Sequence, residues 1–123
     1  SPVSSTAEMT YMIRLDENME KSLRSFIETI AQTEIYQNYA IQKERLKEEP
    51  DLERQIDDYR HKNLEIQQNY HGEELLQKME EFEMNYASLC ANPLVDRYLS
   101  AELALARMYQ EIQKEIHERL GLH

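Results

Sequence analysis

The acids and histidines of this chain come close to one metal-binding pattern found in helical proteins. Di-iron sites in helical bundles take a Glu-x-x-His pair from each of two helices, so that carboxylate oxygens and imidazole nitrogens face the two metals. The nearest match here is Asp58 with His61, and two other histidines are preceded at that spacing by Gln68 and Lys114. Because this ligand set is incomplete, we expect no metal site. A metal-binding helical-bundle enzyme is therefore kept only as an alternative.

Other groups that could carry out catalysis lack the partners that they need. A catalytic carboxylate pair needs burial or a close like charge to separate its two pKa values, whereas Glu80 and Glu81 lie in a run typical of a solvated helix face. Cys90 is the single cysteine. A lone cysteine is commonly a small buried hydrophobic residue, and nucleophilic catalysis would also need a neighbouring base. We predict no catalytic residue, no cofactor and no enzymatic activity.

The charge of the chain disfavours a nucleic-acid surface. It carries 24 acidic and 14 basic residues, which gives a formal charge of −10. Affinity for a phosphate backbone rests on clustered Lys and Arg, and the densest basic cluster, Lys43, Arg45 and Lys47, is interrupted by glutamates. We expect no direct binding of nucleic acid, and an RNA-binding module is the second alternative.

Composition indicates that helices position all of these residues. The 123 residues include 2 glycines, 3 prolines and no tryptophan, so the chain is poor in the turn formers that sheets and catalytic loops need. Hydrophobic residues make up 41% and charged residues 31%, a balance typical of long amphipathic helices. No apolar run approaches the ~20 residues that span a bilayer, so we expect no membrane insertion. One cysteine excludes an intrachain disulfide, which favours a cytoplasmic location.

Capping and breaking residues divide the chain into segments. Residues 1–15, which begin with a stretch rich in Ser and Thr, are predicted to form a flexible N-terminal segment. Residues 16–121 are predicted to form one helical domain. Asp16 can cap the first helix because its carboxylate can accept hydrogen bonds from free N–H groups of the first turn. Further breaks are predicted near Thr33, Pro50, His71-Gly72, Asn92-Pro93 and Gly121.

Apolar residues recur three and four positions apart within the predicted helices, which is the spacing of one helix face. Two long stripes stand out: Leu52, Ile56, Tyr59, Asn63, Ile66 and Tyr70, and Leu94, Tyr98, Ala101, Leu105, Met108, Ile112 and Ile116. Asn63 has two interpretations, a partly exposed amide or a polar contact that sets the register of a helix seam. The aromatic rings suit protein interfaces, where the hydroxyl group of tyrosine reaches the wet margin.

Long helices in a short chain leave little interior for a self-sufficient core. We therefore predict an all-α bundle of four to five antiparallel helices, some long, that is completed by dimerisation. The predicted interface with a partner protein consists of Tyr59, Asn63, Ile66, Tyr70, Tyr98, Leu105, Tyr109, Ile112 and Ile116.

Three stretches resemble the YlbF/YmcA family of competence regulators, also called the YheA/YmcA-like group. They run from Tyr36 to Leu52, from Ile56 to Gln67 and from Asn92 to Glu102, and with the final helix they cover positions 33–120. The resemblance implies a small helical regulatory protein that forms a homodimer or a heteromer with a paralogue. It also implies a role in competence, sporulation and biofilm formation.

The resemblance further implies an RNase Y-associated complex as a partner. Some family members join YmcA and YaaT in a complex that assists RNase Y in messenger RNA maturation, and members of that complex are linked to iron–sulfur clusters through several cysteines. This chain departs from that pattern because it has Cys90 alone, and such a cluster needs about four thiolate ligands. Cluster binding is therefore not expected here, although the sequence leaves open whether Cys90 takes part in a cluster shared between chains.

Overall fold

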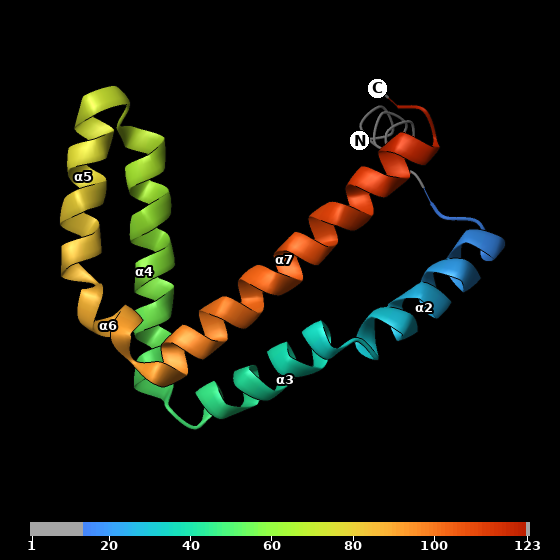
Figure 1. Ribbon diagram of the computed structural model, residues 1–123, viewed down its shortest axis with the longest axis horizontal. Helices are drawn as coiled ribbons and strands as arrows, with labels where there is room; N and C mark the ends of the chain where they lie inside the picture. Colours follow the sequence, from blue (N-terminus) through green and yellow to red (C-terminus); the bar gives the residue numbers. More distant parts are fainter. Residues whose placement is uncertain (1–13, 123) are drawn as a thin grey trace, which may run out of the picture. The chain divides into compact units, whose positions relative to one another are not determined.

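The computed structural model describes residues 14–122, which form six helices and no strand, so the predicted all-α class is confirmed. In chain order the helices are α2 (Glu17–Ala31), α3 (Glu34–Lys47), α4 (Pro50–Asn69), α5 (Gly72–Asn85), α6 (Ala87–Ala91) and α7 (Pro93–Arg119) (Figure 1). The chain divides between Thr33 and Glu34 into two units, one with α2 and one with α3 to α7. The predicted flexible segment 1–15 lies outside the described residues except for its last two positions.

The helix of the first unit, α2, exposes its apolar residues. The Asp16 carboxylate accepts a hydrogen bond from the Met19 backbone N–H at 2.8 Å, which confirms the predicted cap. No residue of α2 is buried. Its apolar stripe includes Met19, Leu23 and Phe26, all exposed, so residues 14–33, the described part of this unit, leave a hydrophobic face of the helix uncovered.

Within the second unit, helix ends fall close to the predicted breaks. The Asn92 side chain accepts from the backbone N–H groups of Leu94 and Val95, and Pro93 occupies the first turn of α7, where its missing N–H costs nothing. Gly72 and Gly121 adopt positive φ angles of 60° and 72°, a conformation that glycine reaches without steric cost. Helix α4 begins at Pro50 itself, at the predicted break.

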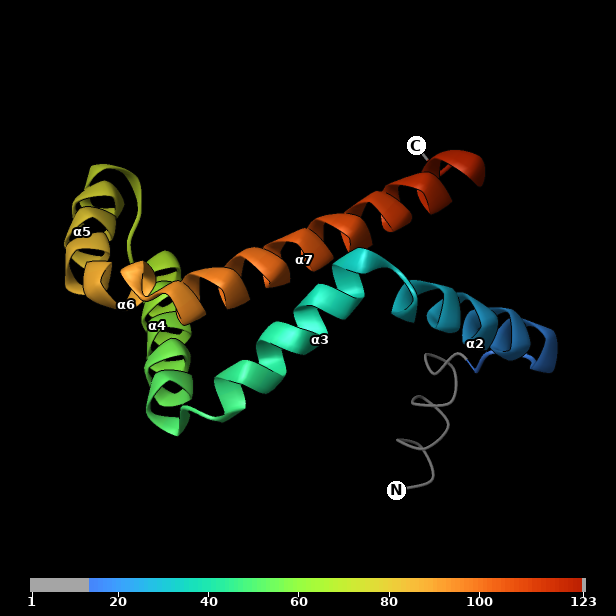
Figure 2. The same ribbon diagram turned by 60° about the horizontal axis from the view of Figure 1, so that its bottom comes forward.

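The second unit consists of two antiparallel helix pairs. Helices α4 and α5 form a hairpin and lie side by side in both views (Figures 1 and 2), while α3 packs along the first part of α7. The pairs meet at a core formed by Leu46, Ile56, Leu89, Val95 and Tyr98. The described helices number six rather than four or five because the chain breaks at Tyr86, which separates the short α6 from α5.

Helix α7 is longer than the helix that covers it. It has 27 residues and α3 has 14, so their lengths are ~40 Å and ~21 Å at 1.5 Å per residue. Because the two run antiparallel from a shared core, the second half of α7 extends past the start of α3 (Figure 1). This difference in length decides which of the predicted interface residues stay uncovered within the unit.

Candidate functional site

The second half of α7 carries an apolar face that its own unit leaves partly open. Five residues that share one helix face define what we call the α7 ridge: Leu105, Tyr109, Ile112, Ile116 and Leu120. Leu105 and Ile112 are half-buried, whereas Tyr109, Ile116 and Leu120 are 61%, 49% and 69% exposed. The ridge continues the same face that Tyr98 and Ala101 bury near the start of α7.

The predicted interface residues on α4 lie in the seam of the hairpin. The Tyr59 ring stacks on Phe82 of α5 with centroids 5.0 Å apart and meets Tyr86 edge-on at 5.4 Å. Ile66 is buried, and the Tyr70 ring lies under the Lys78 ammonium group at 5.4 Å. These α4 side chains therefore meet α5 of the same chain.

Asn63 is half-buried, and its side-chain oxygen accepts a hydrogen bond from the Gln67 amide at 3.4 Å. This geometry fits the partly exposed amide that was one of the two interpretations. A groove of about 480 Å³ opens along the hairpin seam and is lined in part by Ile66, Tyr70 and Phe82. The structure thus separates the predicted set into a hairpin group on α4 and an α7 group.

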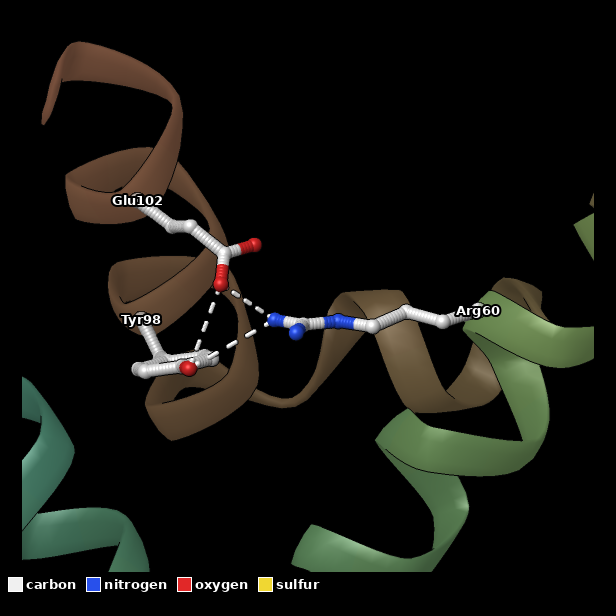
Figure 3. Close-up of polar contacts among 3 residues, drawn as sticks. All are labelled: Arg60, Tyr98 and Glu102. Atoms are coloured by element: carbon white, nitrogen blue, oxygen red, sulfur yellow. Dashed lines mark hydrogen bonds and ion pairs between the residues drawn. The ribbon is translucent and has the colours of Figure 1, made fainter. Parts of the chain in front are cut away.

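A polar cluster joins α4 to α7 beside the core (Figure 3). The Tyr98 hydroxyl donates to the Glu102 carboxylate at 3.2 Å, and the Arg60 guanidinium donates to the Tyr98 hydroxyl at 3.4 Å and forms an ion pair with Glu102. Tyr98 is only 7% exposed, and its ring lies 6.0 Å from that of Tyr39 on α3. Tyr98 was predicted as an interface residue, but its burial leaves little of its surface for a partner.

The sequence did not predict a functional role for Arg60 or Glu102. The signal for half of the cluster was present, because residues four apart on a helix can interact and Tyr98 precedes Glu102 by four. Nothing local in the sequence connects Arg60 to them, since it lies 42 positions before Glu102.

Burial shapes the acid–base properties of this cluster. It raises the pKa of Tyr98 to about 12, opposed by the hydrogen bond from Arg60 and reinforced by the negative charge of Glu102. Burial also raises the pKa of Tyr59, and a hydrogen bond with Cys90 of α6 raises it further. Both phenols therefore stay neutral in the folded chain well into alkaline solution.

Folding stability is expected to fall as the pH rises from 10 to 12. In that range the unfolded chain has lost the Tyr98 proton and the folded chain keeps it, so deprotonation favours unfolding. The full shift corresponds to about 2–3 kcal/mol. Urea denaturation at several pH values checks this: Tyr98→Phe should flatten the alkaline loss, and Tyr109→Phe, at an exposed position, should not. An equal alkaline slope in wild type and Tyr98→Phe would contradict the assignment.

Asp58 and His61, the nearest match to a metal-binding motif, are not part of a set of metal ligands among the described residues. Between residues 14 and 122 no group of three or more His, Cys, Asp or Glu side chains is placed to hold a metal ion. The His61 ring lies 2.8 Å from the backbone carbonyl of Asp57, on its own helix. Over the same described range, none of the helices combines the length and the apolar character needed to cross a membrane.

Comparison with known proteins supplies the family. The family model described as "Control of competence regulator ComK, YlbF/YmcA" matches residues 19–121, which is most of the chain. This chain belongs to the YlbF/YmcA family. The match begins within α2 and ends after α7, so helices of both units lie in the YlbF/YmcA domain.

Curated relatives of this YlbF/YmcA-family chain carry the name UPF0342 protein. One from Desulfitobacterium hafniense is 29% identical over 106 residues, which cover 81% of this chain and 82% of the relative. Another, from Caldicellulosiruptor saccharolyticus, is 27% identical over 89 residues, which cover 71% and 74%. No solved structure matches. The family is that of a competence regulator, which is consistent with a regulatory role.

Proposed function

We propose that this YlbF/YmcA-family chain is a non-catalytic regulatory adaptor that acts through helix-mediated contacts with other proteins. The observation that carries the proposal is the α7 ridge, whose exposed residues continue a face that is buried nearer the core. Membership of a family of competence regulators supports a regulatory role. The regulated processes are proposed to be competence, sporulation and biofilm formation, in the cytoplasm.

Burial of the exposed ridge residues would contribute favourable free energy to association. Full burial of one large apolar side chain contributes about 1.5–3 kcal/mol relative to exposure. Tyr109, Ile116 and Leu120 keep about half or more of their surface exposed, so covering all three would recover several kcal/mol. Met19 and Phe26 on α2 offer further apolar surface of the same kind.

A second copy of the chain or a paralogue is the proposed cover for these faces. In a two-fold dimer the same patch of each chain meets its counterpart, so one apolar ridge can serve both copies. A paralogue with the same helix layout would present a similar ridge. The adaptor would then act by tethering or repositioning further proteins, with no bond made or broken by this chain.

RNase Y is the partner that the family resemblance points to, through an assembly that assists messenger RNA maturation. In that case this chain would contribute protein contacts to the assembly. No direct contact with RNA is proposed, since the formal charge is −10 and opposes a phosphate backbone.

Affinity capture from the native cell tests the adaptor proposal. The full chain is expected to co-purify a paralogue, RNase Y or both, identified by mass spectrometry, and a matched capture with Tyr109→Glu and Ile116→Glu is expected to lose them. If the ridge variant captures the same proteins in the same amounts as wild type, the ridge is not the contact surface. Stoichiometric iron or manganese in protein purified without chelator would instead favour a metalloenzyme.

A further inference from the structure

One ion pair in the second unit differs from the others in what it joins. Of the seven ion pairs described between residues 14 and 122, six connect residues three or four apart within a helix. The seventh joins Arg60 of α4 to Glu102 of α7. Figure 3 shows the Arg60 side chain reaching across to Tyr98 and Glu102, so this contact links the two helix pairs rather than supporting one helix.

The position of Glu102 along α7 makes its contact with Arg60 sensitive to the angle of the helix. It lies nine residues after Pro93, so it is ~14 Å from the start of the helix. If α7 swung by ~10° about its first turn, Glu102 would move by roughly 2 Å, which is enough to break a hydrogen bond. Val95, in the first turn, would move far less. The apolar contacts around Val95 are also non-directional, so they resist a small swing weakly.

Tyr98 connects the same contact to a third helix. Its hydroxyl bonds to both Arg60 and Glu102, its ring packs on Tyr39 of α3, and the guanidinium carbon of Arg60 lies 5.8 Å from the ring centroid. A swing of the hairpin relative to α7 would disturb the ion pair, the hydrogen bond from Arg60 to the Tyr98 hydroxyl and this cation–π contact together.

We propose that Arg60, Tyr98 and Glu102 form a brace that fixes the angle between the α4–α5 hairpin and the α3–α7 pair. Arg60 and Glu102 are then positioning residues, which hold the hairpin groove and the α7 ridge in one relative orientation. The biological value of that orientation rests on the proposed adaptor function. The angle itself is a property of a single chain and is measured without a partner.

A distance measurement within single chains tests the brace. Spin labels are placed at the exposed positions Gln68 on α4 and Gln113 on α7 in the full chain with Cys90→Ala, diluted into excess unlabelled protein. Arg60→Gln and Glu102→Gln are each expected to broaden or shift the distance distribution by roughly 5 Å, because Gln113 lies ~30 Å along α7 and a 10° swing is magnified there.

The matched control is Arg54→Gln, which removes an ion pair with Asp51 inside α4 and should leave the distribution unchanged. The charge-reversed pair Arg60→Glu with Glu102→Arg should restore the wild-type distribution. The brace is overturned if both single variants keep that distribution, or if Arg54→Gln broadens it equally. Should the single variants lose their helical circular dichroism, the reversed pair decides: a wild-type distribution supports the brace and a broader one overturns it.

Measurements on the same samples distinguish failure of the brace proposal from failure of the adaptor proposal. Intrachain distances in diluted labelled protein do not depend on self-association, which light scattering of unlabelled protein measures separately. A wild-type chain that neither self-associates nor captures a paralogue or RNase Y would overturn the adaptor proposal and leave the brace unaffected. Unchanged distances in the brace variants would overturn the brace alone.

Discussion

Replacement of Tyr109 and Ile116 by glutamate is expected to leave the chain folded and to weaken its self-association by at least ~100-fold, equivalent to about 3 kcal/mol. Both side chains are about half or more exposed in the unit formed by α3 to α7, and glutamate is a good helix former, so this unit loses little stability. In a covered ridge, by contrast, each carboxylate would have to be desolvated without a partner. Light scattering across a dilution series measures the change.

The control places similar charge on the opposite side of the same helix. Gln110 and Lys114 are exposed and lie away from the α7 ridge, so Gln110→Glu with Lys114→Glu adds at least as much negative charge without touching it. This control is expected to associate like wild type. Equal dissociation of both double variants would show that net charge, rather than the ridge, governs association.

Replacement of Phe82 by alanine is expected to lower the free energy of unfolding by about 3–5 kcal/mol, the usual range for a buried phenylalanine. Phe82 is only 4% exposed, and its ring lies 5.0 Å from that of Tyr59 and 4.9 Å from that of Tyr86. The cavity would therefore open in the seam that joins α4 to α5. Urea denaturation followed by circular dichroism gives the value.

The second phenylalanine of the chain provides the matched comparison. Phe26 lies on α2 and is 41% exposed, so Phe26→Ala is expected to cost far less stability in the dissociated chain and to weaken association instead. Equal losses of unfolding free energy for the two variants would mean that α2 packs as tightly within one chain as the hairpin does.

Helix class and most helix ends could be predicted because their causes are local. Asp16 and Asn92 cap helices through their own side chains, and Gly121 ends α7 through its positive φ angle. The break at Tyr86 was missed for a related reason. The apolar spacing from Phe82 to Leu89 is continuous, so periodicity alone predicts one helix where the chain forms α5 and α6.

Which element covers each apolar stripe could not be predicted. The spacing of apolar residues shows which face of a helix is apolar, but it does not show which other helix packs against that face. Tyr98 and Tyr109 lie on the same face of α7, yet Tyr98 is buried and Tyr109 is exposed. Their exposure differs because α3 is shorter than α7 and packs only along the first part of it. The contact between Arg60 and Glu102 was missed because the two residues lie 42 positions apart in the sequence. Local sequence patterns do not reveal contacts at such a separation.

Sedimentation velocity of the full wild-type chain over a dilution series tests the central claim most directly. If a second copy of the chain covers the α7 ridge and the apolar face of α2, the chain should sediment as a dimer or larger species and dissociate to the monomer only on dilution. A chain that remains monomeric at every concentration, with full helical circular dichroism and cooperative unfolding, would contradict that claim.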